Sequence, residues 1–345
     1  MRRVPLGLLI ALLVGACVAP GEGAPSTITT TGRIGSPSPT TSAATASSAA
    51  TTSSAALVWR RIPDIPTPRS EVAATVFRNE VYVIGGFGGG RVVEIFDGQR
   101  WRRGPDLLLA VDHPMAASVE ETPASAAGAG VYVFGGNAGG PTARSFRLAP
   151  GATAWTEIAA MPGPRSQGAA VAQGRSIYVV GGYDGQRLAA PTYAYEANAD
   201  RWRQVAAIPT PRDHLAAALV AGRVCAVGGR RLSLTTNLAT LECYDPGADR
   251  WEKAPDAPTA RGGVGAAAVG DRLVFVGGEQ PSGTYKEVEL FDAGSGRWSR
   301  LPDLPTPRHG IGVVAVGRTV YVMSGGPTPG GSQTAVSEAI ALPAQ

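Results

Sequence analysis

Arginines that recur about once every 50 residues are the first side chains in this sequence whose chemistry invites interpretation. A guanidinium binds carboxylate and phosphate groups with two parallel hydrogen bonds, so several arginines on one rim would suit an anionic ligand. A structural role is the alternative, because a glutamate follows four of these arginines after 25 to 30 residues. The candidate pairs are Arg69 with Glu94, Arg212 with Glu242, Arg261 with Glu289, and Arg308 with Glu338.

The exceptions to this pattern favour structural pairing. The second unit has Asp112 where the others have the arginine, and it has Phe146 where a glutamate would be expected. Arginine and glutamate are thus lost together, as partners in a buried ion pair would be. Arg165 stands apart, because Tyr193 takes the place of its glutamate. We therefore identify Arg165 as the candidate functional arginine.

Other charged and aromatic residues are expected to surround Arg165 on one rim of the fold. Aromatic faces stack on sugar rings and arginine binds carboxylates, so this combination predicts a rim that holds an acidic sugar. The candidate binding residues are Arg165, Tyr183, Asp184, Asp213, His214, Arg230, Arg231 and His309.

The three histidines raise the question of a metal site, which needs side chains that converge on one point. In the repeat alignment His113 and His309 match Ser70, whereas His214 matches Glu71. Because side chains alternate between the two faces of a strand, we expect His214 to point away from the other two. The sequence therefore predicts polar rim residues, no metal site and no cofactor.

The cysteines Cys225 and Cys243 fall on neighbouring predicted strands of one repeat. An exported protein could join them in a disulfide. Two buried free thiols are the alternative, because a free cysteine packs as a small apolar side chain. Either arrangement fits the sequence.

Short strands are the elements that must position these residues. Gly and Pro account for 46 and 28 of the 345 residues, and both oppose helix interiors. Small-residue, apolar and Trp-containing runs alternate with turn residues, which is typical of antiparallel strands in an all-β fold. A diglycine ends an apolar run every 46 to 50 residues, at Gly85-Gly86, Gly135-Gly136, Gly181-Gly182, Gly228-Gly229, Gly277-Gly278 and Gly325-Gly326.

Six copies of this unit resemble the kelch repeat, a four-stranded blade of a β-propeller. The resemblance covers residues 57–342 and implies a six-bladed propeller, with a short tail at 343–345. The chain opens with a Trp-type fourth strand at 57–62 and ends with a third-type strand at 335–342, so we expect the N-terminal strand to complete the last blade. The resemblance also implies ligand binding at the face that carries the irregular loops. The tryptophans that mark the blades are Trp59, Trp101, Trp155, Trp202, Trp251 and Trp298.

The N-terminus has the features of an export signal, with two arginines before a short apolar run. Val14-Gly15-Ala16-Cys17 resembles a bacterial lipobox, which implies a signal peptide at 1–16 and a lipid on Cys17. An ordinary signal peptide is the alternative. Residues 17–56 are rich in Ser, Thr, Ala and Pro, and we expect them to form a tether. The protein would then be lipid-anchored at the outer face of the bacterial cytoplasmic membrane or in the periplasm.

The sequence disfavours several classes of function. Lys and Arg number 31 against 27 Asp and Glu, and no basic cluster marks a nucleic-acid surface. The sequence has no zincin, nucleophile-elbow or phosphate-loop motif, so an enzyme is not favoured. We expect a monomeric head that binds a glycan or a protein through one loop-rich face and meets the membrane only through its lipid. The alternatives are a carbohydrate-active enzyme similar to exported kelch sialate mutarotases and, less favoured, a copper oxidase similar to galactose oxidase.

Overall fold

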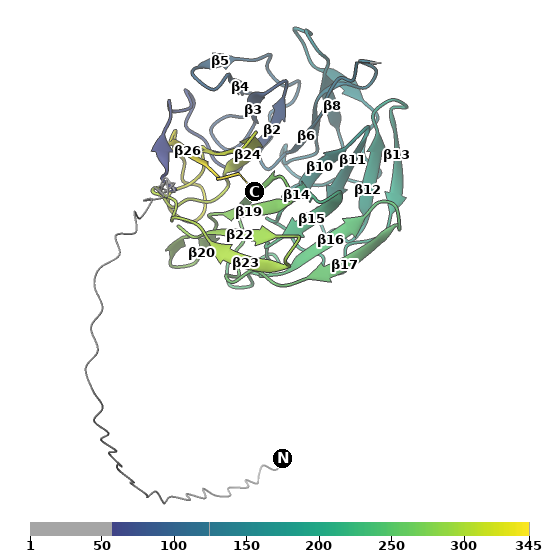
Figure 1. Cartoon of the computed structure of the whole chain (residues 1–345). Helices are drawn as coiled ribbons and strands as arrows, with labels where there is room; N and C mark the ends of the chain where they lie inside the picture. The colour runs from purple at the N-terminus through teal and green to yellow at the C-terminus, as the bar shows by residue number, and fades with distance from the viewer. Residues whose placement is uncertain (1–56, 124, 345) are drawn as a thin grey trace, which may run out of the picture. The chain divides into compact units, whose positions relative to one another are not determined.

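The computed structural model describes residues 57–123 and 125–344, and every regular element in these ranges is a β-strand. Six four-stranded antiparallel sheets stand as blades around a central axis (Figure 1), which confirms the expected six-bladed propeller. Within the described ranges there is no helix long and apolar enough to cross a membrane.

The blades follow one another along the chain and are numbered one to six in the order of their inner strands. A two-stranded hairpin, β20 (Glu279–Gln280) and β21 (Gly283–Thr284), is inserted in blade five. From the inner to the outer strand, the blades are β2 (Ala73–Phe77), β3 (Glu80–Ile84), β4 (Val93–Phe96) and β5 (Trp101–Arg103); β6 (Met115–Val119), β7 (Gly130–Phe134), β8 (Ser145–Leu148) and β9 (Thr156–Ile158); β10 (Ala169–Gln173), β11 (Ser176–Val180), β12 (Thr192–Glu196) and β13 (Arg201–Val205); β14 (Ala216–Val220), β15 (Arg223–Val227), β16 (Leu241–Asp245) and β17 (Arg250–Ala254); β18 (Gly265–Val269), β19 (Arg272–Val276), β22 (Val288–Asp292) and β23 (Arg297–Arg300); and β24 (Gly312–Val316), β25 (Thr319–Met323), β26 (Ser337–Ala341) and β1 (Arg60–Arg61).

The inner strands can approach the axis because their side chains are small. Each inner strand contacts the inner strands of both neighbouring blades, so that the six form a closed ring. Along β14, Ala216, Ala218 and Val220 are buried, whereas Ala217 and Leu219 are only half-buried. A channel of about 370 Å³ remains at the axis, and most of the side chains that line it are alanines.

The six tryptophans tie each blade to the blade before it. Each indole N–H donates to a backbone carbonyl just after the outer strand of the preceding blade, over 2.8–2.9 Å. Tryptophan suits this seam because its ring fills apolar space while its one N–H finds an acceptor. The donor and acceptor residues are Trp59 and Pro302, Trp101 and Pro63, Trp155 and Pro105, Trp202 and Ala159, Trp251 and Ala206, and Trp298 and Pro255.

The N-terminal strand closes the ring, as expected from the order of the repeats. Strand β1 pairs antiparallel with β26, and Arg61 lies opposite Glu338. The backbone N–H of Ile62 continues this pairing by donating to the carbonyl of Ser337 over 3.1 Å. Blade six therefore contains strands from both ends of the propeller, and β26 is paired on both of its sides.

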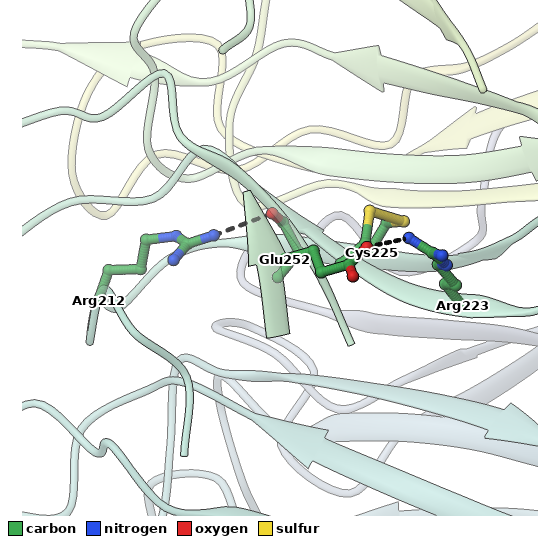
Figure 2. Close-up of a disulfide and its surroundings, with 6 residues drawn as sticks. Arg212, Arg223, Cys225 and Glu252 are labelled. Carbon is green, nitrogen blue, oxygen red and sulfur yellow. Dashed lines mark hydrogen bonds and ion pairs between the residues drawn. A yellow bond between two sulfur atoms is a disulfide. The ribbon is translucent and has the colours of Figure 1, made fainter. Parts of the chain in front are cut away.

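A disulfide joins Cys225 on β15 to Cys243 on β16, which decides between the two arrangements that the sequence allowed. Figure 2 shows the disulfide beside the ion pair of Arg223 with Glu252, with Arg212 farther away. The bond closes a loop with a sequence separation of 18 residues. Loop-closure entropy for a loop of this size is on the order of 3 kcal/mol in favour of the folded state.

Candidate functional site

Six residues with a left-handed backbone form a ring at one mouth of the axial channel. Each lies just before an inner strand, and their φ angles fall between 50° and 68°. Backbone hydrogen bonds run from blade to blade around this ring, for example from the N–H of His113 to the carbonyl of Glu71 and from the N–H of Gln167 to the carbonyl of His113. The ring therefore fixes where four side chains enter one small volume, because two of its six members are glycines. Its members are Glu71, His113, Gln167, His214, Gly263 and Gly310.

This ring corrects the predicted orientation of the histidines. His113 occupies the same ring position as Glu71 and His214, whereas His309 does match Ser70. A left-handed residue interrupts the chain before each inner strand, so strand alternation does not turn His214 away from the others. The rings of His113 and His214 lie 5.0 Å apart between centroids. The prediction that the histidines would not converge is wrong.

Glu71 is the centre of the cluster. Its Oε2 lies 3.1 Å from Nε2 of His113, and its Oε1 lies 3.3 Å from Nε2 of His309. The side chain is only 8% exposed, so these contacts are largely shielded from water. Gly310 leaves the necessary room, because a Cβ at that position would stand 2.5 Å from Oε1 of Glu71.

Each histidine also has an oxygen atom beside its Nδ1. His113 Nδ1 lies 2.6 Å from Oδ1 of Asp112, and His309 Nδ1 lies 3.0 Å from a backbone carbonyl. His214 Nδ1 lies 3.2 Å from Oδ1 of Asp213, but this contact lacks hydrogen-bond geometry. Such oxygen partners fix the orientation of an imidazole and leave Nε2 to face the cluster.

Glu279 and Arg230 complete the cluster on the side of blades four and five. Oε2 of Glu279 lies 3.4 Å from Nε2 of His309, and its Oε1 accepts a hydrogen bond of 2.7 Å from Arg230. Arg230 also lies 3.7 Å from Asp213. The guanidinium thus bridges two carboxylates that would otherwise repel each other.

Burial and charge give the three histidines different protonation. Burial lowers the pKa of His113, but Glu71 and Asp112 outweigh it and raise the pKa to about 9. The pKa of His309 is also raised, because its contact with Glu71 outweighs burial. Burial prevails in His214 and lowers its pKa. Burial acts to raise the pKa of Glu71, but the neighbouring histidines hold it well below its usual value. Near neutral pH, His113 is therefore charged and His214 is neutral.

A cavity of about 80 Å³ adjoins the cluster and is lined in part by Glu71, His113, Gln167 and His214. One water molecule takes up about 30 Å³ of liquid, so the cavity has room for an ion and one or two waters but not for a sugar ring. We call these residues, together with Asp112, Asp213, Arg230, Glu279 and His309, the axial cluster. Its groups can bind a small cation or move protons.

Four of the predicted binding residues belong to the axial cluster: Asp213, His214, Arg230 and His309. Sequence reasoning missed Glu71 and Glu279 as site residues. A signal for Glu71 was present in the sequence. The position two residues after the repeat arginine is polar in three blades, where it is Glu71, Gln167 and His214.

The repeat arginines are buried inside their own blades. A threonine hydroxyl also donates to each partner glutamate, which is why both carboxylate oxygens are occupied in these blades. These contacts make the four arginines structural. The nitrogen–oxygen distances are 2.9 Å for Arg69 and Glu94, 2.6 Å for Arg212 and Glu242, 2.8 Å for Arg261 and Glu289, and 2.5 Å for Arg308 and Glu338.

Blade two requires a correction of one residue. The carbonyl of Val111 accepts from Gly86 just as the carbonyl of Arg165 accepts from Gly136. Val111, and not Asp112, therefore takes the position of the repeat arginine. Asp112 is instead free to hold His113 in the axial cluster.

Arg165 keeps the buried position of the repeat arginine without the carboxylate. The residue is 2% exposed, and its guanidinium lies 4.6 Å from the centre of the Tyr193 ring. One terminal nitrogen donates to the carbonyl of Pro191 over 2.8 Å, whereas Nε has no hydrogen-bond partner in the part of the chain that the structure describes. Burial lowers the pKa of Arg165 to about 10.

A second cavity, of about 540 Å³, lies beside Arg165 on the same loop-bearing face. Tyr193, Asp184 and Arg187 also line it, and Gly163 stands where the four blades with an Arg–Glu pair have the threonine. We call this space the blade-three pocket. Of the remaining predicted residues, Arg231 is exposed and Tyr183 pairs through its backbone with Ser166, and neither lines the two cavities described here.

Comparison with known proteins agrees with this architecture. The family model described as the KLHDC2/KLHL20/DRC7 Kelch-repeats domain matches residues 121–326, and the Kelch motif matches residues 68–108. Among solved structures, the one titled "Structure of YjhT" aligns with a TM-score of 0.67 at 16% identity, over 81% of this chain and 97% of that chain. None of the curated proteins matches the chain.

Proposed function

The chain belongs to the kelch-repeat family of β-propellers, and from this premise we propose that it is a binding module that holds a carboxylate-bearing carbohydrate in the blade-three pocket. The loops that vary between blades lie on this face, and variable loops on a rigid scaffold are where binding usually resides. The pocket volume falls within the range of small-molecule sites.

The observation that carries the proposal is the buried arginine without a carboxylate. Arg69, Arg212, Arg261 and Arg308 each have a glutamate within 3 Å, and burial of an unpaired guanidinium is costly. In blade three a ligand carboxylate could supply the missing charge, while the exposed Arg187 could meet a second anionic or hydroxyl group. Tyr193 also lines the pocket and so brings an aromatic side chain beside the bound sugar.

Titration with N-acetylneuraminic acid, compared with its methyl ester and with glucose, tests this proposal. We expect only the free acid to bind. Arg165→Met should weaken binding by about 10- to 150-fold, because a hydrogen bond to a charged group is lost. Isothermal titration calorimetry gives both affinities. Equal affinity for the acid and its ester, or an unchanged affinity of the variant, would contradict the proposal.

A matched control gives blade three the threonine and glutamate that accompany the arginine in four other blades. The double variant Gly163→Thr/Tyr193→Glu introduces both residues. It should raise the melting temperature, because Arg165 gains its partner, and it should abolish acid binding, because the anion site is filled from within. Retained binding in this variant would place the ligand elsewhere.

A second candidate function is that of a carbohydrate-active enzyme similar to the exported kelch sialate mutarotases. The blade-three pocket favours it, because Arg165 and Asp184 line one cavity of sufficient size, and such an enzyme would use an arginine and a carboxylate. Equilibration of sialic acid anomers followed by NMR distinguishes this candidate from simple binding. The copper-oxidase alternative lacks its Tyr–Cys pair among the described residues, because Cys225 and Cys243 are bonded to each other.

We also propose that Cys17, which lies outside the described residues, carries a lipid and anchors the protein. The sequence Val14-Gly15-Ala16-Cys17 supports this. Cys17→Ser should shift most of the protein from the membrane fraction to the soluble fraction, because stable anchoring depends on acyl chains. Cell fractionation with mass spectrometry of the mature N-terminus checks it. An unmodified N-terminus elsewhere in the chain would refute the assignment.

A further inference from the structure

The axial cluster holds more negative charge than its own arginine can balance. Glu71, Asp112, Asp213 and Glu279 contribute four carboxylates, against the single guanidinium of Arg230. The side chains of Glu71, Asp213 and Glu279 are at most 8% exposed. Carboxylates buried to this extent need compensating positive charge, which either protons on the histidines or a metal ion can supply.

We propose that Glu71, His113 and His214 form a site for a divalent transition-metal ion at the mouth of the axial channel. Each residue offers one ligand atom, and these atoms all lie within 4.8 Å of one another. In a tetrahedral site with bonds of about 2.0 Å, neighbouring ligand atoms are about 3.3 Å apart. The distance of 3.1 Å between Oε2 of Glu71 and Nε2 of His113 already meets this requirement.

The surroundings of the ligands are those that a metal site needs. A metal-bound histidine donates its other ring N–H to a carboxylate or a carbonyl, and Asp112 is placed to accept from Nδ1 of His113. His309 contacts the second oxygen of Glu71 and is itself next to Glu279. We assign His309 as a positioning residue, because it would hold Glu71 in the orientation that binds the ion.

The third ligand, His214, is placed in a similar way. Its side chain is 8% exposed and lines the cavity. Oδ1 of Asp213 lies 3.2 Å from Nδ1 of His214, so a carboxylate stands beside Nδ1 of this ligand as Asp112 stands beside Nδ1 of His113.

The geometry also leaves part of the coordination shell open. Three protein ligands with the cavity beside them match the pattern of catalytic metal sites, in which water or substrate completes the shell. Two histidines and one carboxylate suit Zn²⁺ and Fe²⁺ and do not suit Ca²⁺ or Mg²⁺, which prefer oxygen ligands. The site therefore predicts a first-row transition metal over an alkaline-earth ion.

Titration of the metal-free full-length protein with Zn²⁺ and Co²⁺ tests the proposal without any sugar, so its outcome is separate from that of the blade-three pocket. We expect one equivalent to bind and Co²⁺ to develop the intense visible bands of a four- or five-coordinate ion. His113→Gln and His214→Gln should each weaken binding at least 100-fold. His309→Gln should weaken it about 10-fold, because it removes only an outer partner. Glu157→Gln, at an exposed carboxylate paired with Arg144, is the matched control and should bind as the wild type does.

Nitrogen NMR of the wild-type histidines covers the case in which a variant fails to fold. Zn²⁺ should shift the resonance of one ring nitrogen in each of His113 and His214. Ca²⁺ should shift neither. Absence of any Co²⁺ bands above those of the aqueous ion would overturn the proposal. A response confined to His309 would also overturn it, because the ion would then lie at the neighbouring group of Glu71, Glu279 and His309.

Discussion

Replacing Arg308 by methionine should lower the free energy of unfolding by about 3–5 kcal/mol, the usual cost of breaking a buried ion pair on one side only. Arg308 is fully buried, and its guanidinium donates to Glu338 and to the backbone carbonyls of Ser324, Thr306 and Val322. The substitution leaves the Glu338 carboxylate with the hydroxyl of Thr306 as its one side-chain hydrogen-bond partner among the described residues. Urea denaturation followed by tryptophan fluorescence measures the change.

Two further variants make this expectation specific to burial. Arg300→Met removes an exposed ion pair with Asp303 and should change the stability by less than about 1 kcal/mol. Arg308→Met combined with Glu338→Leu should recover part of the loss, because it removes the stranded carboxylate. If Arg308→Met is no more destabilising than Arg300→Met, the repeat arginines are not structural.

The repeat arginines also show how much of this fold could be predicted from the sequence. The diglycines and tryptophans act within one repeat or between neighbours, so their spacing alone predicts the blades and their closure. The pairing of Arg69 with Glu94 could be inferred from the joint loss of both residue types in blade two. The position of that loss could not be read as easily, because Leu109-Ala110-Val111 stands where blade one has Thr67-Pro68-Arg69 and leaves no Pro-Arg pair to fix the alignment.

The axial cluster could not be predicted in the same way. Glu71, His113 and His214 are 42 to 143 residues apart from one another and meet only because six blades close around one axis. Their left-handed backbone is uncommon for residues other than glycine, so the sequence gives no reason to expect it. His113 and His214 precede their inner strands, where the alternation of side chains along a strand does not apply, and so they converge against that expectation.

The cost of opening the ring is the largest effect that the structure predicts. Strand β1 and its neighbours Trp59 and Ile62 supply the outer strand of blade six, although they precede blade one in the sequence. Trp59 is 9% exposed, lies in one core cluster with Leu304 and Ile340, and donates its indole N–H to the carbonyl of Pro302. Removing a buried tryptophan side chain alone costs about 3–5 kcal/mol.

Deletion of residues 57–62 from the full chain should therefore lower the free energy of unfolding by more than the Trp59→Ala substitution does. It removes the tryptophan, the contact of Ile62 with the core, and the backbone pairing of β1 with β26. It also leaves the outer edge of β26 unpaired, and an exposed strand edge recruits other chains, so the variant should associate at high concentration. Thermal unfolding and size-exclusion chromatography measure the two effects.

Deletion of residues 27–54 is the control for a change in chain length. The Ser-, Thr- and Ala-rich sequence of these residues has too little apolar bulk to build a core, so this deletion should leave the melting temperature and the elution volume unchanged. Equal melting temperatures for the two deletions would mean that the propeller does not depend on its N-terminal strand for closure.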